Sequence, residues 1–376
     1  MSMAAENKIL DYIQLINSAN IGPVTFYKLL RQYGSAEAAL AALPAGRRTF
    51  SRSAAQKEFE LARRQNIRLL AFDDPEYPEN LRAAEDAPPV IYVRGQINCL
   101  RQPLSLSIVG ARNASLNGRK LASQISCELT SQGIMIVSGM ARGIDTAAHK
   151  GAMFALNRSG STVAVLGTGI DIAYPAENQK LCEQIAGQGA VISEFPLGTE
   201  PSAGNFPRRN RIVSALTDGT LVVEASLHSG SLITARLALE QGRDVFAVPG
   251  FPTDERSAGP NKLIKDGAFL VENAEDILNV LSADARRKIP RTPRPVQTDL
   301  FVKPLDKESK TADIPDTASP DRETDILSLL TPAGVYVDEL IRVSGLDSAA
   351  VSLRLLELEM EGRIERQVGN KVALIK

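Results

Sequence analysis

Short apolar runs alternate with amphipathic stretches through the middle of the chain. Six runs rich in Val and Ile have a glycine close to one end: LSLSIVGAR, GIMIVSG, STVAVLGTG, GAVISEF, GTLVVEA and DVFAVPG. Helical patterns such as GRKLASQISCELTSQ and GSLITARLALEQG separate them. Strands that alternate with helices form parallel sheets through right-handed crossovers, and runs that are apolar throughout indicate that helices cover both faces. We therefore expect a doubly wound, mostly parallel Rossmann-like α/β domain over residues 73–285.

The N-terminal region, residues 1–72, is expected to be a helical domain. Apolar residues recur at Ile9, Ile13 and Ile16 and again near residue 30, at helical spacing up to residue 70. The stretch IGPVTFYKLLRQYG resembles one half of a helix-hairpin-helix, but it holds one glycine where that motif usually has two. An ordinary helix–turn–helix packing unit is therefore favoured over that motif for this stretch.

The C-terminal region divides into a linker and a small domain. Residues 286–320 hold six prolines and few large apolar residues, which is typical of an extended linker. Three helical patterns and two strands around Gly369-Asn370 then predict a winged-helix domain over 321–376. This domain carries ten acidic and seven basic residues, whereas a domain that recognises a sequence in double-stranded DNA is normally basic. For this domain we therefore favour contact with another protein, or weak accessory binding of DNA, over sequence-specific recognition of DNA.

Composition narrows the class of protein. The 376 residues are 44% hydrophobic and 23% charged, as in a globular protein of two or three domains. No run approaches the roughly 18–20 apolar residues of a membrane span, and the first residues lack an apolar signal core. A cytoplasmic protein without membrane contact is expected. The three cysteines form no CxxC pair and the two histidines lie far apart, so we expect no metal site and no cofactor.

Charge is distributed unevenly, although the net charge is only −1. Residues 87–217 carry twelve basic and seven acidic side chains, which gives +5 there and −6 over the remainder. A basic segment inside a neutral protein indicates an anionic partner. Ordinary surface variation is an equally good explanation from charge alone.

The glycine-rich strand ends are the first candidate site. In an open parallel sheet, ligands bind beyond the carboxyl ends of the strands, and glycines there let backbone amides approach an anion. The candidates at these ends are Gly110, Ala111, Arg112, Gly139, Arg142, Gly167 and Gly169. Neither GxGxxG nor GxxxxGK[ST] occurs, so phosphate binding is predicted without a dinucleotide fingerprint or a P-loop.

The segment NFPRRNRIVSAL is the second candidate. It places an aromatic ring beside cations, with Phe206 followed by Arg208, Arg209, Asn210 and Arg211. Such a pattern is typical of a stacking platform for an unpaired base, with the guanidinium groups on phosphates. The alternative is that Phe206 fills the core and the arginines pair with Glu194, Glu200 or Glu224.

Catalytic signals are weak. The GxSxG pattern is absent, and His149 in DTAAHKGAM is interpreted as a helix-packing or rim residue more readily than as a general base. We therefore expect that the chain is not an enzyme.

Several blocks together resemble the DprA/Smf family of DNA-processing proteins. They are SIVGAR, SGMARGIDTAAHKGA, GTGIDIAYPAEN, SEFP, FPRRNRI, EASLHSGSLITARLALEQGRDVFAVPG and GPNKLIKDGA, in that family's order over residues 75–280. The resemblance implies binding and protection of single-stranded DNA during natural transformation, and loading of the RecA recombinase. It also implies a homodimer without known catalysis.

The resemblance implies roles for single residues as well. Gly110 and Arg112 would lie in the DNA pocket, the FPxRNR block from Phe206 to Arg211 at or beside it, and Gly139, Arg142, Gly167 and Gly169 around it. Leu263 and Ile264 would take part in dimerisation. Relatives often have lysine where this chain has Ala176 and Ala203, so two cationic contacts are expected to be missing, with Lys180 or Arg208 as substitutes.

A hydrolase is the alternative from another class. Similar Rossmann units cleave nucleoside monophosphates at the glycosidic bond, and Asp145, Asp171, Glu194 and Glu224 offer carboxyl groups for such chemistry. Those enzymes usually carry a PGGxGT-type loop, where this chain has VPGFPTDE. A pure assembly scaffold is a third interpretation, and it leaves the basic segment unexplained.

Overall fold

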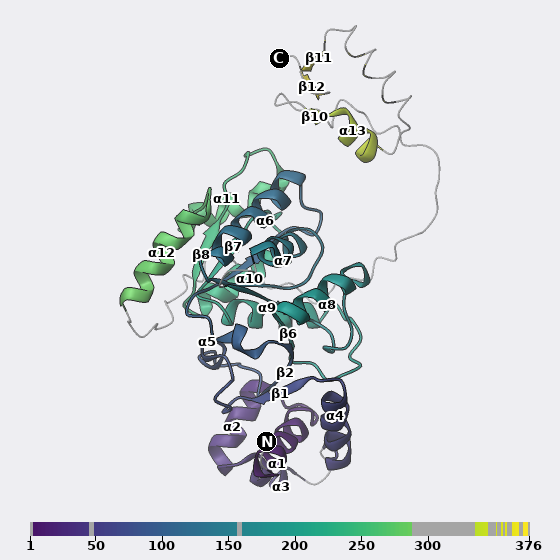
Figure 1. Ribbon diagram of the computed structural model, residues 1–376, viewed down its shortest axis with the longest axis vertical. Coiled ribbons are helices and arrows are strands. Elements are labelled where there is room, and N and C mark those ends of the chain that lie inside the picture. Colours follow the sequence, from purple (N-terminus) through teal and green to yellow (C-terminus); the bar gives the residue numbers. More distant parts are fainter. Residues whose placement is uncertain are drawn as a thin grey trace. The chain divides into compact units, whose positions relative to one another are not determined.

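The computed structural model describes residues 3–44, 49–155 and 160–287, and toward the C-terminus 335–344, 351, 355, 358, 363–367 and 371–374 (Figure 1). The chain forms two units, Met1–Val302 and Lys303–Lys376. The expected linker, residues 286–320, lies almost wholly outside the described residues, so the boundaries at residues 285 and 320 stay predictions. The boundary at residue 72 stays a prediction as well.

A nine-stranded sheet runs through the first unit. Its strands are β1 (Arg68–Ala71), β2 (Val90–Gly95), β3 (Ser105–Val109), β4 (Met135–Ser138), β5 (Ser161–Val165), β6 (Ala190–Ser193), β7 (Gly219–Val222), β8 (Asp244–Ala247) and β9 (Phe269–Leu270). Their order is β1-β2-β6-β5-β4-β3-β7-β8-β9. Within this order, the seven strands β6-β5-β4-β3-β7-β8-β9 pair in parallel, whereas the pairs β1–β2 and β2–β6 are antiparallel. The mostly parallel, doubly wound sheet is confirmed.

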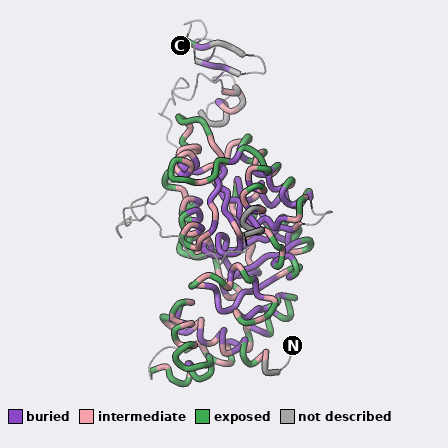
Figure 2. The backbone as a smooth tube through the Cα atoms, turned by 90° about the vertical axis from the view of Figure 1, so that its left-hand side faces the viewer, coloured by how far each residue is buried: buried purple, intermediate pink, exposed green. Residues whose placement is uncertain are grey.

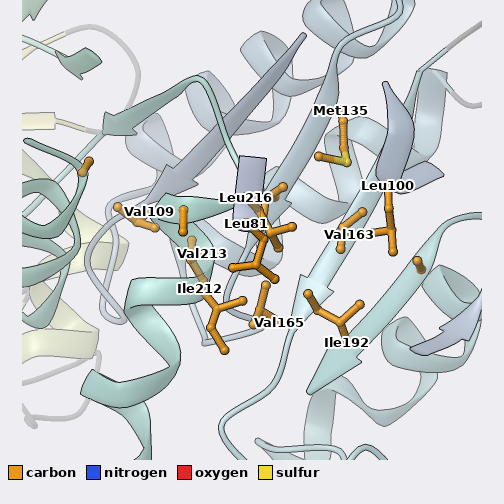
Figure 3. Packing of buried hydrophobic residues seen from close by; sticks show 14 of the residues in the cluster. Leu81, Leu100, Val109, Met135, Val163, Val165, Ile192, Ile212, Val213 and Leu216 are labelled. Carbon is orange, nitrogen blue, oxygen red and sulfur yellow. The ribbon is translucent and has the colours of Figure 1, made fainter. Parts of the chain in front are cut away.

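Helices cover both faces of this sheet. They are α5 (Glu79–Arg82), α6 (Leu116–Ser131), α7 (Ile144–Ala155), α8 (Gln179–Gln188), α9 (Asn205–Ala215), α10 (Gly230–Glu240), α11 (Glu255–Lys265) and α12 (Ala274–Arg287), with 3₁₀ turns at Ile97–Arg101 and Ala176–Asn178. Within β3, Ile108 joins a core cluster with Ile125 of α6, while Val109 joins another with Ile212 and Val213 of α9 (Figure 3). Successive strand residues point to opposite faces, so the covered strands β3 to β8 are buried on both faces, whereas the edge strand β9 is exposed (Figure 2).

The chain order creates a switch point beside β3. From β3 the chain adds β4, β5 and β6 on one side, and it then returns to place β7 on the other side of β3. Leu106 pairs with Gly219 of β7, and Ser105 pairs with Met135 of β4. The loops after β3 and β7 therefore diverge, and in open α/β sheets ligands bind in the crevice outside such a point.

The N-terminal domain is helical, as predicted. Its helices are α1 (Met3–Ile16), α2 (Pro23–Tyr33), α3 (Ala36–Ala41) and α4 (Arg52–Arg64). Pro23 occupies the first turn of α2, Gly34 ends that helix at φ 81°, and the hydroxyls of Ser35 and Ser51 cap α3 and α4.

The prediction of helix up to residue 70 is wrong for Arg68–Ala71, which form β1. Leu70 packs with the central core, whereas Leu69 packs with the N-terminal helices. An extended strand buries side chains on both faces in this way, because its successive side chains point in opposite directions.

The second unit contains a small antiparallel sheet. It consists of β10 (Val335–Tyr336), β12 (Lys371–Leu374) and β11 (Ile364–Gln367) in that order, with α13 (Val337–Ser344) after β10. Leu340, Leu355 and Ile364 belong to its core. The two strands around Gly369-Asn370 are confirmed in a winged-helix domain, whereas the first predicted helix and most of the third lie outside the described residues.

Candidate nucleic-acid interface

A cavity of about 620 Å³ lies at the switch point, beyond the carboxyl ends of β3 and β4. Its walls come from the loops after β3 and β4, from α9, and from the first turns of α10. The residues of the sequence prediction that line it are Gly110, Arg112, Gly139, Phe206, Arg209 and Asn210. Three segments that lie far apart in the sequence therefore meet at one site.

Gly139 in the cavity wall and Gly167 outside it both make room for side chains of α9. A Cβ at Gly139 would lie 1.9 Å from Nη1 of Arg209, and one at Gly167 would lie 2.9 Å from Cδ1 of Phe206. The sequence analysis instead predicted that the glycines at the strand ends let backbone amides approach an anion. Neither Gly167 nor Gly169 lines the cavity, and the amide of Gly169 instead donates to the carbonyl of Thr199 at 2.9 Å.

Arg209 is a buried cation in the cavity wall. Only 5% of its surface is exposed, and its Nη1 donates to the carbonyl of Val165 at 2.7 Å. Burial lowers its pKa to about 10, against the opposing effect of the Asp145 carboxylate. Its Nε has no hydrogen-bond partner among the described residues. Arg209 therefore stays charged at neutral pH, and its Nε is both buried and without a partner among the described residues.

Asp145 holds the loop after β4. Its Oδ2 accepts from the amides of Gly139 at 3.1 Å and Ala141 at 3.3 Å. Burial raises the pKa of this carboxyl, while Arg209 opposes the rise. The carboxylate thus fixes the loop and balances part of the charge of Arg209.

An aromatic and cationic stack forms the opposite part of the site. The guanidinium carbon of Arg112 lies 5.6 Å from the ring centroid of Phe206, and the ring of Tyr174 lies 5.4 Å from it at 35°. Arg112 is exposed and forms no ion pair with any described residue. Such rings and guanidinium groups offer flat faces to an unpaired base and charge to its phosphates.

Tyr174 and the first turns of α10 escaped the sequence analysis. Ser229, Gly230, Ser231 and Thr234 line the cavity, and the hydroxyl of Ser229 accepts from the amide of Ser231 at 3.3 Å. The N-terminus of a helix carries partial positive charge, which favours an anion. The sequence signal for this site is the Ser-Gly-Ser step before an apolar helical pattern, which is typical of a helix N-cap.

Arg211 does not reach the cavity. The residue is 8% exposed, and its guanidinium pairs with the Glu194 carboxylate and donates from Nη1 to the carbonyl of Asp86 at 2.6 Å. The alternative of pairing with Glu194 is therefore confirmed for Arg211.

Two other predicted arginines lie outside the cavity lining. Arg208 lies with its guanidinium carbon 5.1 Å from the ring centroid of Phe195. Arg142 forms an ion pair with Glu177 at 2.8 Å. Both side chains are exposed, so their contact with DNA stays a prediction.

The four acids considered for hydrolysis are engaged in holding the fold. Asp171 accepts from the amide of Gly198 at 3.0 Å, Glu224 accepts from the amide of Ser115 at 2.9 Å, and Glu194 pairs with Arg211. Of the four, only Asp145 lines the cavity.

His149 supports the helix-packing interpretation. It is fully buried, its Nδ1 lies 2.8 Å from Oγ1 of Thr162, and burial lowers its pKa to about 3.

Among the described residues, no group of three His, Cys, Asp or Glu side chains is placed to hold a metal ion. None of the described helices combines the length and the apolar character that a membrane span requires.

The comparison with protein families decides the identity of this chain. The family model described as DNA recombination-mediator protein A matches residues 68–282, more than half of the chain. The chain belongs to this family. Models of the DprA-like N-terminal HHH domain and the DprA winged helix domain match residues 6–68 and 309–370. The predicted DprA/Smf resemblance is confirmed.

Relatives of this DprA-family protein cover most of its length. Protein Smf of Escherichia coli is 39% identical over 87% of this chain and 82% of its own. The X-ray structure of DprA from Streptococcus pneumoniae matches with 37% identity and a TM-score of 0.57, over 65% of this chain and 80% of that one. A structure described for its single-stranded DNA binding mode, DNA processing protein A from Helicobacter pylori, matches with 30% identity and a TM-score of 0.52, over 58% and 96% of the two chains.

Two further predictions from the resemblance, one about a missing lysine and one about dimerisation, can be located in the structure. Ala203 lines the cavity, so a lysine there would have added a cation to its wall. Leu263 is 3% exposed and packs in the core, and Ile264 packs against the same cluster. Side chains of the neighbouring edge strand β9, Phe269 and Leu270, are more exposed, at 42% and 48%. Leu263 therefore contributes to the core, and a contact surface on this edge would consist of other side chains.

Proposed function

We propose that this DprA-family protein binds single-stranded DNA in the cavity at the switch point, protects it, and helps to load the RecA recombinase. The observation that carries the proposal is the meeting of Arg112 and Arg209 with the rings of Phe206 and Tyr174 in one cavity. The cations suit a phosphodiester backbone, and the rings suit bases. Protection, RecA loading and a setting in natural transformation rest on the family resemblance.

A single strand is favoured over a duplex for a steric reason. The rings and Arg209 lie in a cavity, and an unpaired base can turn into it, whereas a stacked base pair cannot. The homologue from Helicobacter pylori, whose structure is described for its single-stranded DNA binding mode, supports the same choice. The exposed apolar side chains of β9 support a homodimer through this edge.

We infer that the protein acts by binding, without catalysis. The hydrolase alternative needs a free carboxyl group at the cavity, and Asp145 is already bonded to two backbone amides. The test uses two assays on one preparation: fluorescence anisotropy of a labelled dT oligonucleotide, and release of free base from nucleoside monophosphates. Binding without base release is expected, and base release without oligonucleotide binding would favour the hydrolase.

Tyr174→Ala is expected to weaken single-strand binding about five- to tenfold, because one stacking face is lost. Tyr174→Phe keeps the ring and should bind like the wild type. The anisotropy assay at several salt concentrations measures both, and the salt dependence should not change, since no phosphate contact is removed. Equal binding by the alanine variant would remove Tyr174 from the site.

Deletion of residues 321–376 is expected to leave most of the single-strand affinity in place. The region carries net charge −3, so it adds no general attraction to DNA. The same anisotropy assay on the truncated chain measures the effect. A loss of more than tenfold would show that the winged-helix domain belongs to the binding site.

A further inference from the structure

The loop between β6 and α9 connects the N-terminal helical domain with the cavity. Pro201 and Ala203 of this loop line the cavity, and the loop leads directly into Phe206 at the start of α9. The side chain of Leu197, near its beginning, packs with the apolar cluster of the N-terminal helices. The position of this cavity wall therefore depends on a neighbouring domain.

Glu58 of α4 makes the polar contact at this junction. Its Oε1 accepts a hydrogen bond from the amide of Leu197 at 2.7 Å. The same carboxylate also acts on the buried Tyr92 of β2, whose pKa is raised by burial first and then by Glu58. Glu58 thus joins α4, the sheet and the cavity loop.

The loop is also tied within itself and to the loop after β5. Gly198 donates its amide to the Asp171 carboxylate at 3.0 Å, and the carbonyl of Thr199 accepts from the amide of Gly169 at 2.9 Å. The hydroxyl of Thr199 donates to the carbonyl of Pro196 at 2.6 Å. These bonds tie Leu197, Gly198 and Thr199 into one held segment, and the chain runs from it through residue 200 directly into Pro201 and Ala203 of the cavity wall.

We propose that Glu58 is a positioning residue for the nucleic-acid cavity. It holds the loop after β6 at Leu197, and through this loop it fixes one wall of the cavity and the entry into α9. The N-terminal domain thereby acts on single-strand affinity without touching the strand. This inference rests on the proposed function of the cavity.

The test compares three variants of the full chain by anisotropy with a labelled dT oligonucleotide. Glu58→Ala removes the acceptor and should bind about three- to tenfold more weakly, as expected for the loss of one partly buried hydrogen bond. Glu58→Gln keeps an acceptor oxygen for Leu197 and should restore most of the affinity. Glu60→Ala is the matched control, since Glu60 is exposed on the same helix and bonds only to Gln56 among the described residues.

The salt dependence separates positioning from charge. Glu58→Ala should keep the slope of the wild type, because a positioning residue removes no phosphate contact. A lower melting temperature with unchanged affinity would show a purely structural role and overturn the inference. Failure of the wild type to bind would instead overturn the proposed function and this inference with it.

Hydrogen exchange of the wild type gives a second measurement that does not depend on the folding of a variant. Saturation with the dT oligonucleotide should slow exchange of the Leu197 amide, since occupancy of the cavity steadies the loop that Glu58 holds. Unchanged exchange at Leu197, with slower exchange elsewhere in the cavity wall, would contradict the inference.

Discussion

The Arg112→Ala variant should bind single-stranded DNA about ten- to a hundredfold more weakly than the wild type while folding normally. Arg112 is exposed, forms no ion pair with a described residue, and contacts the Phe206 ring. Its removal therefore disturbs little of the fold, but it takes away a charged hydrogen-bond donor for a phosphate. The slope of log affinity against log salt should fall in magnitude by about one unit.

Arg119→Ala is the matched control for this prediction. Arg119 is an exposed arginine on α6 that does not line the cavity, so its loss should leave the affinity close to that of the wild type. Anisotropy titrations at several salt concentrations measure both variants. Wild-type binding by Arg112→Ala would mean that the strand is held elsewhere.

The Arg211→Ala variant should lose about 3–5 kcal/mol of unfolding free energy, because it leaves the Glu194 carboxylate without its counter-ion. The Glu194 side chain is 6% exposed, and burial already raises its pKa, with Arg211 as the main opposing influence. Without Arg211 this pKa rises further. The loss should therefore shrink as the pH falls through that raised value, because a protonated Glu194 needs no counter-ion.

Urea denaturation at two pH values measures this prediction, with Arg119→Ala as the control. Arg119 is exposed and forms no ion pair with any described residue, so its removal should change the unfolding free energy by no more than about 0.5 kcal/mol. Normal stability together with lost DNA binding in Arg211→Ala would place Arg211 at the DNA, as the sequence pattern suggested.

Strands β3 to β8 of the parallel part were predictable because they are apolar, lie buried on both faces and have glycines close to one end. β1 and β2 were harder to predict, because they pair antiparallel at the junction with the N-terminal domain. There, alternate side chains serve two different cores, so Leu69 and Leu70 look like part of a helical pattern when the sequence is read alone.

The arginine segment shows what the sequence could and could not predict about the site. Residues 206, 209, 210 and 213 share one face of α9, and they line the cavity together with Pro207. Arg208 and Arg211 lie outside this lining. The sequence showed the charges, but which of them face the cavity depends on how α9 packs against the sheet.

The contribution of distant segments was also beyond the sequence. Tyr174 and the first turn of α10 are separated from Phe206 by more than twenty residues on either side, and they carry no charge that would single them out. They reach the cavity because the chain reverses its direction of strand addition beside β3. A pattern of local spacing does not contain this information.

The most direct test is equilibrium binding of a labelled dT oligonucleotide and of a matched duplex over a series of salt concentrations. A cavity that neutralises about three or four phosphates predicts tight single-strand binding with a log–log salt slope of roughly −2 to −3, and weaker duplex binding. Absence of single-strand binding at low salt, or a preference for the duplex, would contradict the assignment of the cavity.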